Sequence, residues 1–164
     1  MQQRRLFAIL RSLCQSDIEF IVVGGLAAVL NGAPVQTYDL DLVYSREPNN
    51  LDRLLKVLGE LDAIFRIQPE RRLRPNHSHL AGTGHLNLLT PYGPLDLLAV
   101  AGHNLGFAQL LPHTVEMDIG EGVRVRVLNL ETIISIKEYL ASEKDLAVLP
   151  ILRQTLREST RRPR

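Results

Sequence analysis

Residues 20–44, FIVVGGLAAVLNGAPVQTYDLDLVY, form the stretch around which the rest of the chain is organised. An apolar run at 20–23 ends at Gly24-Gly25, a helix-forming run follows at 26–30, and the stretch closes on alternating acidic and apolar residues. This order predicts a buried strand, a tight turn, a short helix and a second strand that returns beside the first.

Two aspartates lie in the second of these strands. Because alternate side chains of a strand share a face, Asp39 and Asp41 point to one side and the neighbouring leucines to the other. Carboxylates held this close raise each other's proton affinity unless a cation lies between them. Their oxygens suit Mg²⁺ or Mn²⁺. The pair predicts a divalent metal site, and a surface position on an edge strand is the alternative.

The glycine pair comes directly before the short helix. Without side chains, Gly24 and Gly25 let backbone N–H groups approach a phosphate closely, and the dipole at the start of a helix adds attraction. The metal and phosphate sites would be neighbours, because the second strand returns beside the first. Taken alone, the glycine pair could also be a plain turn.

A third aspartate lies further along the chain. Residues 85–90 and 95–100 flank a Pro/Gly turn and predict a β-hairpin, with Asp96 among leucines in its second strand. A carboxylate in an apolar strand is costly unless it meets a partner such as a metal. If that strand pairs beside the strand of Asp39, the three carboxylates converge on one site.

The remaining patterns predict helices flanking a mixed sheet. Apolar periodicity and cap residues indicate helices at 6–13, 48–61, 107–111, 129–141 and 146–156, and strands at 63–67, 115–119 and 123–128. Pro150 predicts a new turn or a bend in the last helix. We expect an α+β (α/β) fold in one compact domain, with a core at 1–128 and a helical segment packed on it at 129–164.

The composition is that of a globular protein with no general attraction to nucleic acid or membranes. The chain has 164 residues, 45% of them hydrophobic, and a formal net charge of +1. No apolar run approaches the roughly 20 residues that cross a bilayer, and the apolar stretch near the N-terminus is too short for a signal peptide. A cytoplasmic location is expected.

The glycine pair, the D-x-D strand and two later motifs together resemble a known family. The segments GGLAAVLNGAPVQTYDLDLVY, GPLDLL and VRVLNLETIISIKEYLASEKDLAVLPIL are similar to small nucleotidyltransferases of the DNA polymerase β superfamily. More narrowly, they resemble AbiEii-like families and the minimal nucleotidyltransferases of toxin-antitoxin pairs. The resemblance spans residues 20–152 and implies a mixed sheet with flanking helices, in agreement with the predicted order of elements.

The resemblance implies roles for the central motifs. Gly24 and Gly25 match residues that hold a nucleoside triphosphate. Asp39 and Asp41 match carboxylates that bind two metal ions, Mg²⁺ or Mn²⁺. Asp96 matches a third carboxylate, which shares a metal and accepts the proton of the attacking hydroxyl.

Four further residues match positions near the active site of the family. Thr37 matches a threonine that helps to order the strand. Lys137, Lys144 and Asp145 match late residues that contribute to nucleotide binding. Lys137 falls within the apolar stripe of the helix at 129–141, where it could offset phosphate charge. A snorkelling side chain, or an ion pair with Asp145, is the alternative for this lysine.

The reaction implied by the resemblance is in-line attack of an acceptor hydroxyl on the α-phosphorus of a nucleoside triphosphate, with pyrophosphate leaving. The acceptor would be a protein or an RNA. The setting would be a toxin-antitoxin system, with a cognate toxin or antitoxin as partner.

The chain also departs from the family pattern. Val35 stands where many relatives have an arginine, Asn31 where they have a histidine, and residues 141–143 where they have Gly-Arg. These departures leave open a catalytically weak nucleotide-binding or antitoxin-like interaction module. A D-x-D phosphohydrolase is a third reading, disfavoured because Leu42-Val43 follow the pair and a glycine pair precedes it.

A polar segment at 66–79 is the last candidate. His77 and His79 alternate in a way that could bind a transition metal, although histidines in a polar loop are usually solvated. The arginines from Arg66 to Arg74 are expected to form a solvated face rather than a nucleic-acid patch. Solvated histidines and solvated arginines both predict that this segment is exposed and rich in turns.

Overall fold

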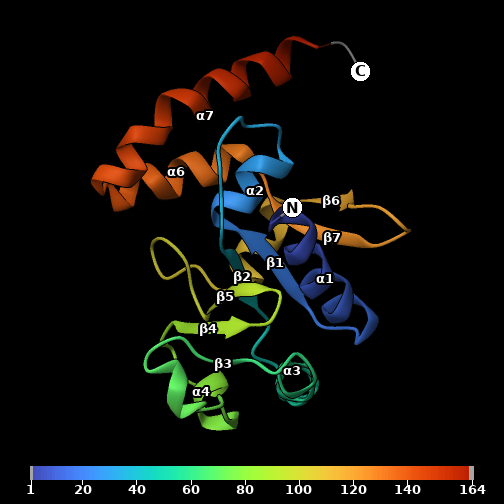
Figure 1. Cartoon of the computed structure of the whole chain (residues 1–164). Helices are drawn as coiled ribbons and strands as arrows, with labels where there is room; N and C mark the ends of the chain where they lie inside the picture. The colour runs from blue at the N-terminus through green and yellow to red at the C-terminus, as the bar shows by residue number, and fades with distance from the viewer. Residues whose placement is uncertain (1, 163–164) are drawn as a thin grey trace.

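The computed structural model describes residues 2–162 and contains one mixed sheet with helices on both faces (Figure 1). Its strands are β1 (Phe20–Val23), β2 (Leu40–Tyr44), β3 (Ile64–Phe65), β4 (Leu86–Thr90), β5 (Gly93–Leu98), β6 (Thr114–Asp118) and β7 (Arg124–Leu128). Its α-helices are α1 (Gln2–Gln15), α2 (Gly24–Leu30), α3 (Pro48–Glu60), α4 (His77–Ala81), α5 (Phe107–Leu110), α6 (Leu130–Leu140) and α7 (Glu143–Arg161). Short 3₁₀ turns are η1 (Pro69–Arg71) and η2 (Leu111–His113). The predicted α+β architecture is confirmed.

The seven-stranded sheet has the order β3-β4-β5-β2-β1-β7-β6. β1 and β2 are antiparallel neighbours, as predicted from residues 20–44, and β2 pairs in parallel with β5. The register sets Asp41 opposite Val23 on one side and opposite Asp96 on the other. Two acidic strands that are distant in the sequence therefore lie side by side at the centre of the sheet.

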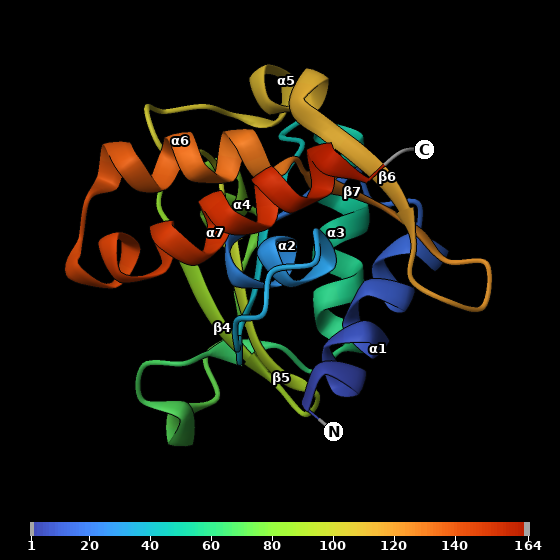
Figure 2. The same ribbon diagram turned by 90° about the horizontal axis from the view of Figure 1, so that it is seen from above.

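The two faces of the sheet carry different layers of helices. α1 and α3 contact each other on one face, where a Cβ placed on Gly93 of β5 would be 3.2 Å from Leu6 of α1. α2 and α6 lie over the other face, and α7 packs on α6 (Figure 2). Because side chains alternate along β2, Leu40 and Leu42 are buried under the first layer while Asp41 faces the second.

The N-terminal helix illustrates how the sequence pattern becomes packing. Its apolar stripe is fully buried, as the helical spacing predicts, and consists of Leu6, Ile9, Leu10 and Leu13. Burying a side chain of this size contributes about 1.5–3 kcal/mol. The layer formed by α1 and α3 therefore stabilises the sheet from the face opposite the aspartates.

A short helix forms where the sequence predicts an exposed, turn-rich segment. α4 begins after Asn76, whose side chain accepts a hydrogen bond from the backbone N–H of His79 at 3.0 Å. The ring Nδ1 of His79 accepts one in return from the backbone N–H of Asn76 at 2.9 Å. Leu80 is buried beneath this turn. The segment is largely exposed, as predicted, but its helix was not predicted, because histidine takes the place that Glu or Gln usually has in such a reciprocal cap.

Several element boundaries differ from their predicted positions, and three of these differences lie close to the acidic strands. β2 begins at Leu40, so Asp39 lies just before the strand rather than within it. α2 begins at Gly24 rather than after the glycine pair. β3 forms over a short part of the predicted 63–67. As a result Asp41 is held by the sheet, whereas Asp39 is held by the connection that leads into it.

α7 runs without interruption past its internal proline. Ser142 caps the helix, and its Oγ accepts a hydrogen bond from the backbone N–H of Asp145 at 3.1 Å. Pro150 lies inside the helix, so of the two predicted alternatives, a new turn or a bend, the new turn was wrong. Leu149 and Leu152 are buried on either side of the proline, and this packing offsets the backbone hydrogen bond that proline cannot donate.

Within the described residues, no helix combines the length and the apolar character needed to cross a membrane.

Replacing Pro150 with alanine should stabilise the protein. Alanine restores the N–H that can bond to the carbonyl of Leu146, and it favours a helix interior where proline costs about 3 kcal/mol. Part of this gain is lost because proline also restricts the unfolded chain. We expect the free energy of unfolding, measured in urea, to rise by roughly 1 kcal/mol. Pro48→Ala is the matched control, since proline is favourable at the first turn of α3 and its removal should give no gain. A loss of stability in Pro150→Ala would contradict this account.

Candidate functional site

The three predicted carboxylates influence one another in the structure. Asp41 and Asp96 are register partners on β2 and β5, and Asp39 lies just before β2. Burial raises the pKa of Asp41 to about 7, together with smaller contributions from the charge of Asp96, a hydrogen bond with Asp96 and the charge of Asp39. The charge of Lys144 opposes this shift. The result is a concentration of negative charge on a partly buried face of the sheet.

The glycine pair is packed directly against this acidic strand. Gly24 has a φ of +66°, and a Cβ placed there would clash with the carboxylate of Asp41. A Cβ on Gly25 would lie 2.8 Å from Oγ1 of Thr37. The Thr37 hydroxyl in turn donates a hydrogen bond to the carbonyl of Asp39 at 3.1 Å. Small residues are therefore required for the turn to approach the two aspartates.

The corner between α6 and α7 supplies the late charged residues. Nζ of Lys137 lies 3.0 Å from Oδ1 of Asp145, and both side chains are largely buried. The hydroxyl of Ser142 donates to Oδ2 of Asp145 at 2.5 Å. Burial acts to raise the pKa of Asp145, but the hydrogen bonds from Ser142 and Lys137 prevail and lower it. Lys137 thus has a carboxylate partner, whereas Lys144 is exposed and acts on Asp41.

Two adjoining cavities lie over this part of the sheet. The polar chamber, of about 340 Å³, is lined by all the predicted site residues except Asp96, namely Gly24, Gly25, Thr37, Asp39, Asp41, Lys137, Lys144 and Asp145. The apolar chamber, of about 270 Å³, is lined mainly by aliphatic residues of β5, the segment after it and α6. A larger cavity of about 390 Å³ near Cys14, Phe20 and Arg124 lies away from the three aspartates.

Asp96 instead contacts an arginine. Nη2 of Arg66 donates to Oδ1 of Asp96 at 2.7 Å and to the carbonyl of Leu88 at 3.2 Å. The Asp96 side chain is 14% exposed and that of Arg66 is 36% exposed, so the pair is partly shielded from water. The Nε of Arg66 is buried without a hydrogen-bond partner. The predicted solvated face of arginines is therefore wrong for Arg66.

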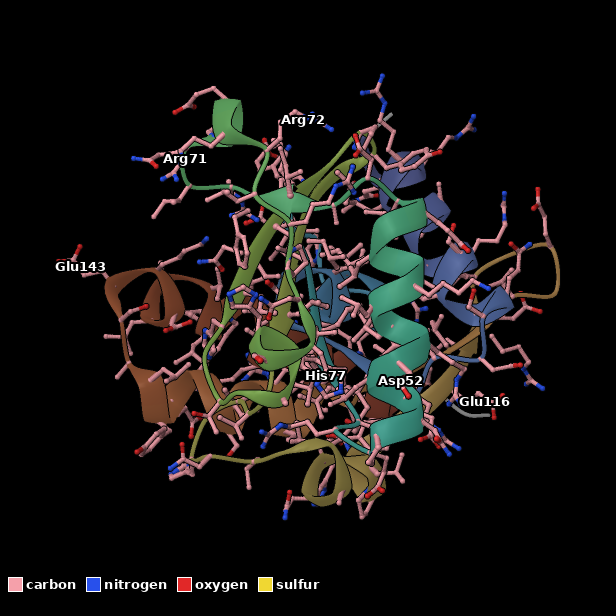
Figure 3. The ribbon with its side chains drawn as sticks, turned by 90° about the horizontal axis from the view of Figure 1, so that it is seen from below. Asp52, Arg71, Arg72, His77, Glu116 and Glu143 are labelled. Atoms are coloured by element: carbon pink, nitrogen blue, oxygen red, sulfur yellow. The ribbon has the colours of Figure 1, made fainter. Side chains whose placement is uncertain are left out.

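The strand order explains why this arginine differs from its neighbours. The backbone N–H of Arg66 bonds to the carbonyl of Asn87 at 2.9 Å, and Asn87 is the register partner of Asp96. Arg66 therefore extends the edge of the sheet and reaches across β4 toward β5. Arg71 and Arg72, by contrast, lie at the periphery, where they are exposed (Figure 3). In the sequence, an aspartate among leucines indicated that Asp96 needs a positively charged partner. The pairing of β3, β4 and β5 is needed to identify that partner as Arg66.

The residues that depart from the family pattern have structural roles. The side-chain amide of Asn31 donates to the carbonyls of Ala27 and Leu128, at 2.8 and 3.0 Å, and so ties the end of α2 to the end of β7. Val35 packs against the core and lines the polar chamber. An uncharged residue therefore stands at a position where an arginine would add positive charge to this cavity.

The donor types at the site suit a divalent metal, but their present placement does not enclose one. Asp39 and Asp41 offer oxygen ligands. Burial and then the neighbouring charges of Asp96 and Asp39 raise the pKa of Asp41, and a bound cation would offset these effects. Among residues 2–162, however, no group of three or more His, Cys, Asp or Glu side chains is placed so that it could hold a metal ion. One oxygen of Asp96 is bonded to Arg66. Three-carboxylate binding would therefore have to use the other oxygen of Asp96 or displace Arg66 from the first.

The two histidines proposed as alternative metal ligands have other contacts. His77 lies on α4 with its Nε2 3.8 Å from a carboxylate oxygen of Asp52 on α3 (Figure 3). The ring of His79 caps α4 and packs edge-on against Phe65, with 5.0 Å between the ring centroids. Both residues therefore help to attach α4 to its neighbours.

Replacing Asp41 with asparagine should stabilise the metal-free protein at high pH. The folded pKa of Asp41, about 7, lies above the unfolded value, so its contribution to stability is present at low pH and is lost as the pH rises through 7. Asparagine does not ionise, so the variant keeps its stability as the pH rises. In urea denaturation with EDTA, we expect the free energy of unfolding of Asp41→Asn to exceed that of the wild type by on the order of 2 kcal/mol at pH 8 and by little at pH 4.

Asp62→Asn provides the control of opposite sign. Hydrogen bonds from Arg72, followed by those from Arg74, lower the pKa of Asp62, so its charged form is favoured in the folded state. Its replacement should bring no gain at pH 8. Equal effects of Asp41→Asn at both pH values would contradict the raised pKa of Asp41, which burial and then the neighbouring carboxylates cause.

The Arg66–Asp96 pair should be strongly coupled energetically. Arg66→Gln leaves Asp96 beside Asp41 without its cation and should cost roughly 1–3 kcal/mol of unfolding free energy at pH 7. Adding Asp96→Asn should recover much of that loss, which a double-mutant cycle in urea would measure. Arg71→Gln, at an exposed position, should change stability by less than about 0.5 kcal/mol. Additive effects of the two substitutions would disprove the coupling.

Comparison with known proteins shows which solved structures share this fold. No protein-family model and no curated protein matches the chain. Among solved structures, a candidate nucleotidyltransferase from Thermotoga maritima matches with a TM-score of 0.58 and 16% identity, over 95% of this chain and 92% of that one. The antibiotic-resistance factor ANT(2'')-Ia matches with a TM-score of 0.61 and 16% identity, over 93% and 83% of the two chains. The lincosamide antibiotic adenylyltransferase LnuA, solved with lincomycin bound, matches with a TM-score of 0.62 and 13% identity, over 93% and 96%. The chain therefore has a nucleotidyltransferase-like fold.

Proposed function

We propose that this protein is a nucleotidyltransferase that moves a nucleoside monophosphate from a nucleoside triphosphate to an acceptor hydroxyl. One observation carries the proposal. The polar chamber joins the glycine turn, Asp39, Asp41 and the lysines of the α6–α7 corner in a single cavity, with Asp96 in register beside Asp41. In a nucleotidyltransferase-like fold, this set provides anion-binding backbone, positive charge and metal-binding oxygens together.

The residues of the polar chamber suit a triphosphate. Gly24 and Gly25 leave room for the chain of phosphates to approach the backbone. Lys144 is exposed at the chamber and can neutralise phosphate charge without breaking an ion pair. Lys137 can do so if it leaves Asp145. Asp39 and Asp41 would hold Mg²⁺ or Mn²⁺, which would supply charge neutralisation at the transferred and leaving phosphates.

The proposed chemistry makes one bond and breaks one. The acceptor oxygen bonds to the α-phosphorus, the bond from the α-phosphorus to the bridging oxygen breaks, and pyrophosphate leaves. Asp96 would accept the proton of the acceptor hydroxyl. Because Arg66 bonds to Asp96, the arginine must shift or share the carboxylate before that step.

Three classes of acceptor are candidates for this reaction. The names of two structural neighbours refer to antibiotic resistance and to a lincosamide antibiotic, which favours including small hydroxyl compounds among the candidates. Proteins and RNA, within a toxin-antitoxin pair, are the acceptors that the sequence resemblance favours. A screen should therefore cover all three classes.

Transfer should depend on the two aspartates of the polar chamber. The protein is incubated with α-labelled nucleoside triphosphates, Mg²⁺ or Mn²⁺, and RNA, protein extract or hydroxyl-bearing antibiotics. We expect labelled product with at least one acceptor and a loss of at least about a hundredfold in Asp39→Asn and Asp41→Asn. Asp52→Asn, at an exposed carboxylate on α3, is the matched control and should keep full activity. Undiminished transfer in Asp39→Asn would overturn the proposal.

The Arg66–Asp96 pair favours one alternative, a protein that binds nucleotides without turning them over. In that case the arginine neutralises Asp96 permanently and the site lacks its proton acceptor. Saturable nucleotide binding by the wild type with no transfer to any acceptor class, together with transfer that appears in the variant Arg66→Gln, would favour this alternative.

A further inference from the structure

The apolar chamber lies next to the polar chamber and has a different lining. Leu98 and Val100 form its wall on the side of the sheet, and Ile133 and Ile136 form the wall on the side of α6. Five polar side chains also line it, namely His85, Asn104, Asp41, Lys137 and Asp145. The chamber is therefore a slot between two aliphatic walls with a few polar groups.

The walls of this slot are fixed by contacts between α6 and the segment after β5. Gly102, at a φ of +55°, lies so close to α6 that a Cβ there would be 3.0 Å from Cγ1 of Ile136. The rings of His103 and Tyr139 pack together with 3.4 Å between their centroids. The slot is thus built into the fold rather than left by a loose loop.

The two chambers meet at the proposed reaction centre. Both are lined by Gly24, Asp41, Lys137 and Asp145. If the β- and γ-phosphates occupy the polar chamber and the α-phosphate lies at Asp41, the nucleoside is joined to that α-phosphate by a single bridging oxygen. The space that continues on the other side of Asp41 is the apolar chamber.

The position of Asp96 argues against the acceptor as occupant of this space. An acceptor hydroxyl must reach the carboxylate that takes its proton, but Asp96 lines neither chamber. Its side chain contacts Asp41 on one side and, on the other, Arg66, which is partly exposed and lies beyond β4. The acceptor would therefore approach over β4 and Arg66, which leaves the apolar chamber free for the other substrate.

The chemistry of the slot matches a nucleoside. A nucleobase has two apolar faces and polar edges, so aliphatic walls can cover its faces while a histidine and an asparagine bond to its edges. A volume of about 270 Å³ is on the scale of a small-ligand pocket and excludes a folded acceptor. We propose that the apolar chamber between β5 and α6 binds the nucleoside of the nucleoside triphosphate. This inference rests on the proposed function.

The test separates binding of the nucleoside from binding of the phosphates. Isothermal titration in Mg²⁺ measures the affinity for inorganic tripolyphosphate and for the α,β-methylene analogues of ATP, GTP, CTP and UTP, none of which requires an acceptor. We expect the best analogue to bind the wild type at least tenfold more tightly than tripolyphosphate.

Two variants fill the slot from opposite walls. Val100→Phe acts from the side of the sheet, and Leu140→Trp acts from the end of α6. Leu140 is 54% exposed, so a larger side chain there should not disturb the core. Each variant should weaken the best analogue at least tenfold while the affinity for tripolyphosphate stays within twofold. Ile151→Trp, an exposed position on α7 that lines neither chamber, is the control and should change neither affinity.

The possible outcomes distinguish the inference from the function on which it rests. Unchanged analogue affinity in both folded variants, as judged by circular dichroism, would overturn the nucleoside pocket alone. The nucleoside pocket would also be overturned if tripolyphosphate and every analogue bound the wild type with equal affinity. The same holds if the variants lost affinity for tripolyphosphate and for the best analogue to the same extent. Failure of the wild type to bind any of these ligands would instead overturn the proposed function.

Discussion

The contact between the carboxyl groups of Asp41 and Asp96 is the constraint on which the rest of the site depends. Parallel pairing of β2 and β5 sets these two residues side by side, and burial strengthens the conflict between their charges. Arg66 bonds to one of them and Lys144 acts on the other. Gly24 packs directly against the carboxylate of Asp41. A site built from like charges is costly to the fold, and such costs are typical of positions kept for function rather than stability.

The surrounding positive charges differ in how freely they can act. Arg66 and Lys137 each have a carboxylate partner in a partly buried ion pair, whereas Lys144 is exposed. Breaking a buried pair costs more than redirecting a solvated lysine. An incoming polyanion would therefore meet Lys144 first and would draw on the other two only by compensating Asp96 and Asp145.

Much of the fold follows from local patterns in the sequence, but the contacts of the site depend on strand order. The glycine turn, the D-x-D strand and the hairpin containing Asp96 are all readable because their signals lie within a few residues of one another. Arg66 could not be placed in the same way, since its partner is two strands away in the sheet. α4 was missed because His79 caps it with a ring nitrogen, and α7 passes Pro150 because buried leucines on both sides hold it. In each case tertiary packing overrides a local preference.

The parallel β2–β5 pair also has a consequence for how the molecule is assembled. β1 and β2 can form from adjacent segments, but β5 joins β2 only after the long crossover containing α3, β3, α4 and β4 has closed. Closing such a loop is entropically expensive and slow. We therefore expect the glycine turn and the first two aspartates to come together before the third aspartate joins them with its arginine, so that the proposed site is completed late in folding.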